Sequence, residues 1–524
     1  MSSRMAGKSN PQAAVDLFES AEYNTRINKL IDEWHIPALS ISLVHNGTTT
    51  SRAFGKPNLD SSAPCTPSTL FDIASCSKSL TAASVGLFVD DDENYPHVQW
   101  DTPISKLLPD DFVMSQDDCT RNITVEDILS HRTGLPTHDG SYLGQTASTP
   151  DTPKSVTRNL RNLELNAGLR AKYQYCNIMF TVAAHLVEVL SGMHFADFLQ
   201  EKIFDSLGMK STFLYPEVAQ RSSQGHELAV GYEWFAEKEH HCTIPYDNTP
   251  EAAGAGCIVT TPTDYCKWLQ AFISQSAPLS PKLVKGLTTP RTICNGDADA
   301  GDLEPHTSFQ MYALAWETYF YRGLKIVRHD GCIGGFSSVH FFLPEHGLGG
   351  ALFGNTEEAS SVGEVVMKEL IDELLQIPKD ERPDWNAIRW KGYNEMAKKS
   401  AHEREDVLEK VCSDLKEPQP FKGSLDKYTG EYWNSGYRGV TMEVKEGKLF
   451  VDMSDRSCNG FWLKFEHLSD GTLFLVNLVR PFESANQEFW EARFVIENGL
   501  VVKMGLKLEP DIEGLIWFDR VVKA

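Results

Sequence analysis

The stretch IASCSKSLTAASVGLFVDDD, residues 73–92, places Ser75 three positions before Lys78 at the start of an apolar-periodic run. We expect a helix over residues 75–89, whose apolar face is formed by Leu80, Val85, Leu87 and Phe88. Residues three apart lie on one helix face, so the Lys78 amine can reach the Ser75 hydroxyl. The pattern predicts either a nucleophile with its base on the first helical turn, or a polar helix start that carries a surface lysine.

A serine hydroxyl becomes a nucleophile only when a neighbouring base takes its proton. A lysine can be that base when burial or a nearby cation lowers its pKa, and a helix N-terminus offers N–H groups to a developing oxyanion. Ser-x-x-Lys also occurs at Ser413 and Ser424, but only the match at Ser75 opens a helix with an apolar face. Ser75 and Lys78 are therefore the candidate pair, and a capped helix with an exposed lysine stays the alternative.

A serine that is activated by lysine usually needs a second group that handles protons. Tyr175-Cys176-Asn177 lies just before a helix expected over residues 178–190. A phenol whose pKa is lowered between cations can act first as general base and then as general acid. Tyr-x-Asn also occurs at Tyr246 and Tyr432, and the alternative for Tyr175 is a loop aromatic that packs on the body of the protein.

The triplet His-x-Gly occurs three times, beginning at His45, His138 and His329. The first copy falls in a hairpin turn and the second in a loop, whereas the third ends the strand-like run LKIVRHDGCIGGFSS. A glycine there lets the backbone approach a substrate closely, and an edge strand can offer an N–H group to an oxyanion. The alternative for His329 is a histidine at a strand end on the surface.

The first half of the chain has the pattern of an α+β body. PALSISLVHNGTTTSRAFG, residues 37–55, reads as a β-hairpin about Asn46-Gly47. Helices are expected over 124–130, where Asp127 sits at the capping-box offset from Thr124, and over 178–190, 195–204 and 362–375. Further strands are expected near residues 256–261, 312–316, 337–342 and 349–355. Strands at both ends with helices between them predict that the first and last strands share one sheet.

Two breaks in composition divide the 524 residues, which exceed what one core usually holds. QIPKDERPDW ends the first part at about residue 378, and EPQPF ends a charged helical stretch at about residue 420. From residue 425 the chain alternates in short runs separated by turns. We therefore expect a catalytic domain over 1–378, a charged helical linker over 379–420 and a small antiparallel barrel or sandwich over 421–524.

Composition indicates which partners are unfavourable and which cellular compartment to expect. A net charge of −23 argues against nucleic acid and against anionic membranes. The chain shows no apolar run of about 18 residues and no secretory h-region, and its 11 cysteines contain no CxxC pair. We therefore expect a cytoplasmic protein with reduced thiols. His240-His241-Cys242 lacks the usual ligand spacing, so we expect no metal and no cofactor.

The order of the three motifs resembles the serine β-lactamase and penicillin-binding protein superfamily, in particular its tyrosine-using branch. That branch includes class C β-lactamases, D-aminopeptidases, D-alanyl-D-alanine carboxypeptidases, family VIII esterases and lovastatin-type acyltransferases. The resemblance covers about residues 27–375. It is strengthened by VEDILSHRTGLPT (125–137), WDTPISKLLP (100–109), IFDSLGMKSTFL (203–214), AGAGCIVTTPTDYCKWL (253–269) and GGFSS (334–338). The resemblance implies the fold of that family, with a C-terminal barrel of lipocalin type added.

The resemblance also implies roles for individual residues. Ser75 would be acylated, Lys78 would polarise it, and Tyr175 would carry the proton to the leaving group and later activate water. Asn177 would hold a substrate amide or ester, and His329 would add positive charge at the strand edge. The remaining positions of the third motif, Asp330, Gly331 and Cys332, would bind substrate, with the N–H groups of Ser75 and Cys332 as the oxyanion hole.

One departure bears on the substrate. The middle position of the third motif is usually Thr, Ser or Gly in this family, and here it is Asp330. An aspartate would repel a substrate carboxylate, so a neutral or cationic amide, ester or peptide fits better than a β-lactam. We expect a serine hydrolase that acts on a small metabolite or peptide. An acyltransferase with the same acyl-enzyme and a non-catalytic scaffold remain alternatives, and homo-oligomerisation stays open.

Overall fold

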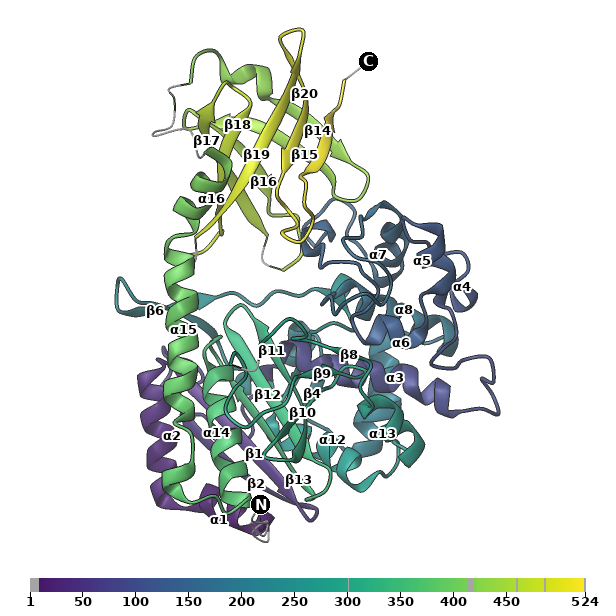
Figure 1. Cartoon of the computed structure of the whole chain (residues 1–524), viewed down its shortest axis with the longest axis vertical. Coiled ribbons are helices and arrows are strands. Elements are labelled where there is room, and N and C mark those ends of the chain that lie inside the picture. Colours follow the sequence, from purple (N-terminus) through teal and green to yellow (C-terminus); the bar gives the residue numbers. More distant parts are fainter. Residues whose placement is uncertain are drawn as a thin grey trace.

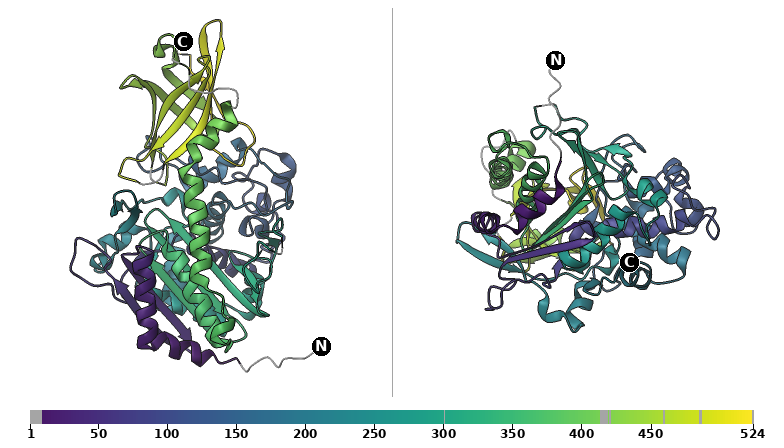
Figure 2. Two further views of the ribbon diagram at one scale, coloured as in Figure 1. Left: turned by 60° about the vertical axis from the view of Figure 1, so that its left-hand side comes forward. Right: turned by 90° about the horizontal axis from the view of Figure 1, so that it is seen from below.

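The structure is a computed structural model that describes residues 9–299, 301–412, 419, 421–458, 460–484 and 487–522. A body of sheet and helices carries a closed β-barrel above it, and helix α15 (Trp385–Ala401) runs along one side of the body toward the barrel (Figure 1). Figure 2 shows the same helix leading from the body to the barrel. The fold therefore has the α+β body and the antiparallel C-terminal barrel that the sequence predicts.

An antiparallel sheet of eight strands forms the centre of the body. Its order is β2-β1-β13-β12-β11-β10-β9-β8. The strands are β1 (Ala38–His45), β2 (Thr48–Gly55), β8 (Thr292–Ile293), β9 (Met311–Tyr312), β10 (Glu317–Tyr321), β11 (Leu324–Ile333), β12 (Phe336–Leu343) and β13 (Leu348–Gly354). Leu39 of β1 lies opposite Gly354 of β13. This pairing confirms that the first and last strands share one sheet.

Backbone conformation in two turns explains how the chain enters and leaves the sheet near its two edges. Asn46 and Gly47 both have positive φ, 50° and 75°, as a two-residue hairpin turn requires, so the predicted hairpin is confirmed. The strand expected over 312–316 is wrong beyond Tyr312. Ala315 has φ 63° and donates its N–H to the carbonyl of Leu129, so the chain leaves the sheet there and bonds to the helical region.

Helices cover both faces of the sheet. One face packs on α1 (Pro11–Glu19), α2 (Ala21–Glu33) and α14 (Ala359–Leu374), and the other on α12 (Pro262–Ser274). Because neighbouring strand residues point to opposite faces, Leu39, Ile41 and Leu43 enter the core of the first face, whereas Ala38 and Val44 enter that of the second. The second core continues into the helical region that carries the site.

The helical region lies beside the sheet and consists of short elements around two long helices. These are α3 (Lys78–Asp90) and α8 (Ile178–Ser191), which contact each other. Around them lie α4 (Ile104–Leu107), α5 (Asp117–Asn122), α6 (Val125–Leu129), α7 (Pro153–Asn159), α9 (Phe195–Leu199), α10 (Asp205–Leu207), α11 (Pro216–Arg221) and α13 (Pro281–Thr288). Small sheets complete it: β3 (Phe71–Asp72), β4 (Thr212–Leu214) and β7 (Ile258–Thr260), and the hairpin β5 (Gly231–Phe235) and β6 (His240–Ile244).

The predicted helices are largely confirmed. The helix expected over 178–190 is α8, and α6 begins with the predicted capping box, in which the Thr124 N–H donates to Asp127 Oδ2 at 2.9 Å. The helix expected over 195–204 is divided into α9 and a π-helical turn at Gln200–Phe204.

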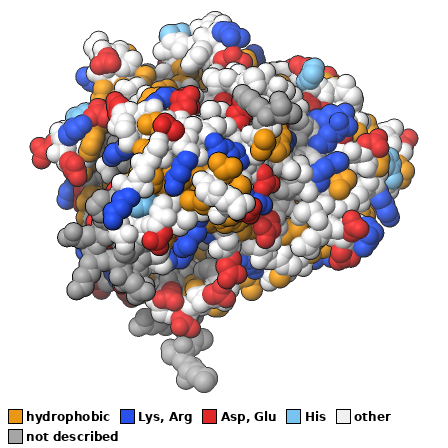
Figure 3. Space-filling model, turned by 90° about the horizontal axis from the view of Figure 1, so that it is seen from above, with side chains coloured by type: hydrophobic (Ala, Val, Ile, Leu, Met, Phe, Trp, Pro, Cys, Tyr) orange, Lys and Arg blue, Asp and Glu red, His pale blue; other side chains and the backbone are white. Residues whose placement is uncertain are grey.

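The barrel closes eight antiparallel strands in chain order. They are β14 (Gly430–Asn434), β15 (Arg438–Lys445), β16 (Lys448–Met453), β17 (Phe461–Ser469), β18 (Leu473–Val479), β19 (Glu488–Glu497), β20 (Leu500–Leu506) and β21 (Ile516–Arg520). Closure leaves no free sheet edge. In the space-filling view from above (Figure 3), basic and acidic side chains intermingle over this end of the molecule and hydrophobic side chains form small separate groups.

The linker helix packs on the body through aromatic side chains. Trp390 of α15 meets Trp34 edge to face at 4.7 Å between ring centroids, and Trp385 Nε1 donates to Asp372 Oδ2 at 2.8 Å. A second helix, α16 (Glu403–Cys412), follows and contacts β19. The predicted helical linker extends to residue 420, and residues 413–418 and 420 lie outside the described residues.

Within the described part of the chain, no single helix has the length and hydropathy needed to span a bilayer. Only the broken pair Ile178–Ser191 and Phe195–Leu207, bent by 80°, meets that test by length and composition.

One fully buried side chain joins three segments at the end of β13. Asn355 Oδ1 accepts from the Ala38 N–H at 2.7 Å, and its Nδ2 donates to the carbonyls of Val230 at 2.9 Å and Pro57 at 3.3 Å. Ala38 is fully buried, so the Asn355 amide satisfies an N–H group that would otherwise be buried without a partner.

We expect Asn355→Ala to lower the free energy of unfolding of the body by about 2 kcal/mol, because it leaves the buried Ala38 N–H without a partner. Urea unfolding followed by tryptophan fluorescence measures the loss. Asn28→Ala is the matched control, because that exposed amide bonds only within its own helix, and it should change stability by less than about 0.5 kcal/mol. Equal losses for the two variants would contradict this account of Asn355.

Candidate active site

A strained turn presents Ser75 at the start of α3. β3 ends at Asp72, Ala74 takes the left-handed φ of 45°, and a 3₁₀ turn covers Ala74–Ser77 before α3 begins. Left-handed backbone is unfavourable for a residue with a Cβ atom. The buried Asp72 compensates by accepting the Ala74 N–H at 2.8 Å. The sequence predicted that Ser75 lies within a helix over residues 75–89. In the structure Ser75 lies instead on a tight turn ahead of α3.

Lys78 is fully buried beside the candidate nucleophile. Its Nζ lies 2.9 Å from Ser75 Oγ and donates to the carbonyl of Ala255 at 2.7 Å. Burial disfavours the charged form and lowers the pKa of Lys78 to about 7, although the nearby Asp139 opposes the shift. Near neutral pH a large fraction of Lys78 is therefore an uncharged amine that can take the Ser75 proton.

Tyr175 approaches Ser75 from the opposite segment. Its hydroxyl donates to Ser75 Oγ at 2.7 Å, and its ring lies 5.0 Å from Lys78 Nζ. Burial raises the pKa of Tyr175 well above its usual value, which is opposite to the lowered pKa expected from the sequence. The phenol is therefore protonated in the resting site, where it can give a proton to a leaving group.

His131 packs against Tyr175 and was not predicted as a site residue. The two ring centroids are 4.2 Å apart, and His131 Nδ1 accepts the Cys176 N–H at 3.0 Å. Burial and the nearby Lys78 lower the pKa of His131, so the ring is neutral. The sequence signal for His131 is the stretch SHRTGLP, residues 130–136, which resembles the family segment quoted above.

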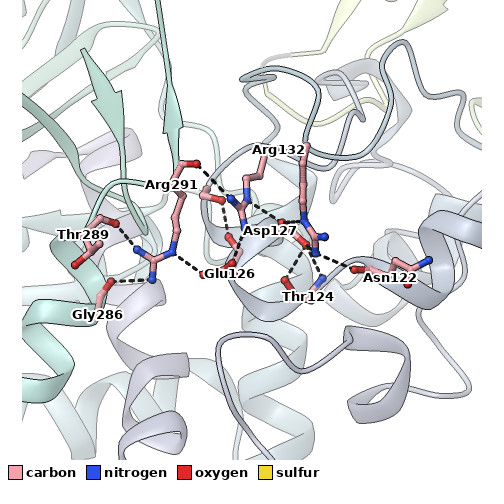
Figure 4. A network of polar contacts seen from close by, with 10 residues as sticks. Asn122, Thr124, Glu126, Asp127, Arg132, Gly286, Thr289 and Arg291 are labelled. Carbon is pink, nitrogen blue, oxygen red and sulfur yellow. Dashed lines mark hydrogen bonds and ion pairs between the residues drawn. The ribbon is translucent and has the colours of Figure 1, made fainter. Parts of the chain in front are cut away.

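A network of ion pairs fixes the segment that carries His131 (Figure 4). Asp127 is fully buried and pairs with Arg132 at 2.8 Å and with Arg170 at 2.6 Å. Glu126 pairs with Arg132 and with Arg291, each at 2.6 Å. Because the network ties α6 to two loops, it holds His131, and through it Tyr175, in place.

Asp139 is a second site residue that the sequence analysis missed. It belongs to the second His-x-Gly copy, which was placed in a loop. Asn177 Nδ2 lies 3.3 Å from Asp139 Oδ2, so the predicted substrate-binding amide already contacts a carboxyl group. Burial raises the pKa of Asp139 to about 6, against the influence of Lys78 and Asn177. The site thus contains an acidic group within electrostatic reach of the candidate base.

His329 lies on β11 but is held as a neutral ring. Its Nε2 bonds the Tyr312 hydroxyl at 2.8 Å and its Nδ1 bonds the carbonyl of Asp330 at 2.5 Å. Burial lowers the pKa of His329 to about 4. The expected positive charge at this strand edge is therefore absent near neutral pH, because the side chain is desolvated and already hydrogen-bonded.

The rest of the third motif shapes the floor of the site. A Cβ atom on Gly331 would lie 2.8 Å from the Ser75 nitrogen and 2.3 Å from the Ile73 carbonyl oxygen, so the glycine permits close contact with the backbone that carries the nucleophile. Asp330 is half exposed and pairs with Arg328 at 2.9 Å. Cys332 is exposed on the same strand.

β11 has an open edge beside the nucleophile. β10 pairs with β11 only as far as Arg328, opposite Glu317. Among the described strands, only β12 pairs with residues 329–333 of β11. The carbonyls of His329 and Asp330 already bond Cys76 Sγ and His329 Nδ1, and an edge without a neighbouring strand can bond an extended chain through its remaining backbone groups by strand addition.

Loops of the barrel bind the loops that carry the site. Glu509 Oε2 accepts the His138 N–H at 2.6 Å, and the Tyr437 hydroxyl bonds His138 Nδ1 at 2.7 Å. Asp511 Oδ2 accepts from Gln174 Nε2 at 2.7 Å. His138 precedes Asp139 and Gln174 precedes Tyr175, so the barrel holds both loops. Sequence spacing carried no signal for these contacts.

Comparison with known proteins agrees with this architecture. A family model described as Beta-lactamase matches residues 24–368, and one described as Domain of unknown function (DUF3471) matches residues 415–520. The chain is 36% identical over 434 residues to Unguisins hydrolase ungD' of Aspergillus campestris (strain IBT 28561), covering 82% of this chain and 79% of the relative.

One more distant sequence relative and one solved structure are also similar to this chain. D-aminopeptidase of Brucella ovis (strain ATCC 25840 / 63/290 / NCTC 10512) is 26% identical over 272 residues, or 50% of this chain and 47% of the relative. The octameric penicillin-binding protein homologue from Pyrococcus abyssi superimposes with a TM-score of 0.59 at 18% identity, covering 96% of this chain and 100% of that one. At that identity the match shows the fold alone.

The burial of Lys78 predicts a pH dependence for the reaction of Ser75. Only the neutral amine can accept the serine proton, so the reactive form is lost as pH falls through the Lys78 pKa of about 7. The rate at which a fluorophosphonate labels Ser75 should rise about tenfold between pH 6 and pH 8 and then level off. A rate that is flat over this range would contradict the assignment of Lys78 as base.

Removing the Asp139 charge tests the same electrostatics. A carboxylate favours the protonated amine, so Asp139→Asn should lower the Lys78 pKa and move the midpoint of the labelling profile to lower pH. Asp60→Asn, at an exposed loop position, should leave the midpoint unchanged. A shift to higher pH in Asp139→Asn would show that another group controls the profile.

Proposed function

Because the chain belongs to the serine β-lactamase and penicillin-binding protein superfamily, we propose that this serine hydrolase cleaves an amide or ester bond of a small metabolite or peptide through an acyl-enzyme on Ser75. One observation carries the proposal. Ser75 Oγ lies within hydrogen-bonding distance of both a buried lysine with a lowered pKa and a protonated tyrosine. A hydroxyl placed between a base and an acid has what acyl transfer requires.

The first half-reaction forms the acyl-enzyme. Neutral Lys78 takes the Ser75 proton while Ser75 Oγ attacks the substrate carbonyl carbon, and the carbonyl oxygen becomes an oxyanion that the N–H groups of Ser75 and Cys332 would bind. As the tetrahedral adduct collapses, Tyr175 gives its proton to the leaving amine or alkoxide. The Lys78 ammonium then returns a proton toward Tyr175, so both groups end as they began.

The second half-reaction releases the acyl group. Water attacks the ester on Ser75, and its proton passes to the neutral amine of Lys78. The second tetrahedral adduct collapses to a carboxylic acid, and Ser75 regains its proton. The products are an acid and the amine or alcohol released first, and each proton is accounted for by Lys78 and Tyr175.

The surroundings of Ser75 favour a peptide-like amide as substrate. The open edge of β11 offers backbone hydrogen bonds to an extended chain. Asp139 and Asp330 place carboxyl groups near the site and would repel a substrate carboxylate. A relative that is 36% identical is named for the hydrolysis of unguisins, and a more distant one is a D-aminopeptidase. Together these features support an uncharged or cationic amide.

Intact-mass spectrometry tests the nucleophile. Incubation with a fluorophosphonate, and separately with p-nitrophenyl butyrate, should add one mass label per chain to the wild type and none to Ser75→Ala. Ser424→Ala is the matched control, because Ser424 also precedes a lysine by three positions but caps a short 3₁₀ turn at the start of the barrel domain, and it should label fully. Lys78→Ala should slow labelling by about 10²–10⁴-fold, the usual contribution of a general base.

The outcomes separate the proposal from its alternatives. No adduct on folded wild-type protein would overturn the enzymatic role of Ser75 and favour a scaffold. An acyl adduct that persists in water but disappears when an amine or alcohol is added would favour an acyltransferase. Turnover in water alone, lost in Ser75→Ala, would support hydrolysis.

A further inference from the structure

The β5–β6 hairpin presents different residues on its two faces. His241 turns toward the body: its Nε2 bonds the carbonyl of His35 at 2.7 Å, and the neighbouring Trp234 stacks on the His35 ring at 3.9 Å. Since side chains alternate along a strand, His240 and Cys242 lie on the other face. That face meets Glu483, which belongs to the loop after barrel strand β18.

Three ligand-type atoms converge there. His240 Nε2 lies 3.4 Å from Glu483 Oε2 and 3.6 Å from Cys242 Sγ. All three atoms lie within 4.8 Å of one another. A tetrahedral zinc ion with its usual bond lengths separates nitrogen from oxygen by about 3.4 Å and nitrogen from sulfur by about 3.6 Å. The two observed separations match the edges of such a tetrahedron.

We propose that His240, Cys242 and Glu483 bind one zinc ion that joins the hairpin of the body to the barrel. Thiolate, imidazole and carboxylate together are donors that suit Zn²⁺ and not Ca²⁺ or Mg²⁺, which prefer oxygen. No metal is expected here from the sequence alone, because adjacent ligands lack a metal-binding spacing. In the fold the ligands are not adjacent residues. His241 points toward the body, and Glu483, more than 200 residues later in the chain, joins His240 and Cys242.

The fourth position has two candidates on the same face. Glu233 of β5 lies directly opposite Cys242 of β6, and directly opposed side chains have Cβ atoms about 5 Å apart. A water molecule is the other candidate. Either completes four-coordination, and a water ligand would leave the ion open to exchange.

Zinc binding must displace a proton from Cys242 and the Lys238 ammonium from Glu483, and both can leave to solvent. The Cys242 thiol loses its proton to solvent as the Zn–S bond forms, and the Lys238 ammonium, which now pairs with Glu483, returns to water. Cys242 is only 4% exposed, but His240 and Glu483 keep 43% and 47% of their side chains exposed. The ion can therefore enter from the solvent side.

The hairpin also touches the strand that borders the nucleophile. A Cβ atom on Gly231 of β5 would lie 3.1 Å from Gly335 and 2.7 Å from the ring of Phe336, in the turn between β11 and β12. The Tyr232 N–H donates to the carbonyl of Asn355 at 3.1 Å. A zinc ion would thus fix the barrel loop relative to the segment that ends β11.

Metal titration of the full-length protein tests the site. Protein stripped with EDTA is titrated with Zn²⁺ in competition with a chromophoric chelator, and with Co²⁺ as a spectroscopic probe. We expect one tight equivalent per chain and a thiolate-to-cobalt charge-transfer band. Cys242→Ser and His240→Ala should weaken zinc binding by at least about 100-fold, more than the loss of an outer-shell partner. The band should vanish in Cys242→Ser.

His241→Ala is the matched control, because it removes an adjacent imidazole that faces the body. It should keep the equivalent and the band. Equal affinity in wild type and Cys242→Ser, or an equal loss in His241→Ala, would overturn the site. Circular dichroism shows whether each variant is folded. Since Ser75 labelling is measured separately, a failure of the zinc site and a failure of the hydrolase mechanism give different results.

Discussion

The burial of a single amine, Lys78 Nζ, sets the conditions that the rest of the site must meet. An ammonium ion in a protein interior is strongly disfavoured, so enclosing Lys78 brings its pKa to about 7. Its enclosure comes from the packing of α3 against α8, from the Ala255 carbonyl and from the aromatic rings of Tyr175 and Phe180. The hydrophobic packing of the helical region therefore lowers the pKa of Lys78 enough for it to act as a base near neutral pH.

The barrel takes part in this arrangement through polar contacts at its loops. Glu509 and Asp511 hold the residues that precede Asp139 and Tyr175. Such contacts fix loops that would otherwise owe their position only to the body, and a displacement of a reacting group by about 1 Å is enough to slow catalysis strongly. The barrel and the body are therefore joined at the loops that carry the site, even though each has its own β-sheet.

Local patterns predicted the parts of the site that depend on local geometry. The spacing of Ser75 and Lys78, and the position of Tyr175 before a helix, led to the three groups that the structure brings within hydrogen-bonding distance. The hairpin turn and the alternating runs led to the sheet and the barrel. Asp139 was missed because three His-x-Gly triplets look alike in sequence, and only the fold places the second beside Asn177. Protonation states could not be predicted from the sequence pattern, because they depend on burial and on partners from distant segments. His329 is neutral because it is buried and bonds Tyr312, which lies on another strand.

The register of the central sheet has a consequence for how the chain is made. β1 needs β13 as a neighbour, and roughly 300 residues separate the paired positions Leu39 and Gly354. A ribosome adds about 5–20 residues per second, so the first hairpin waits about 15 to 60 s for its partner strand. During that time an apolar strand, ALSISLVH, has one edge uncovered, which is the kind of surface that pairs with other nascent chains. The hairpin is therefore open to pairing with other nascent chains until β13 has been made, so the order of synthesis exposes this chain to association before the stability of the finished fold can protect it.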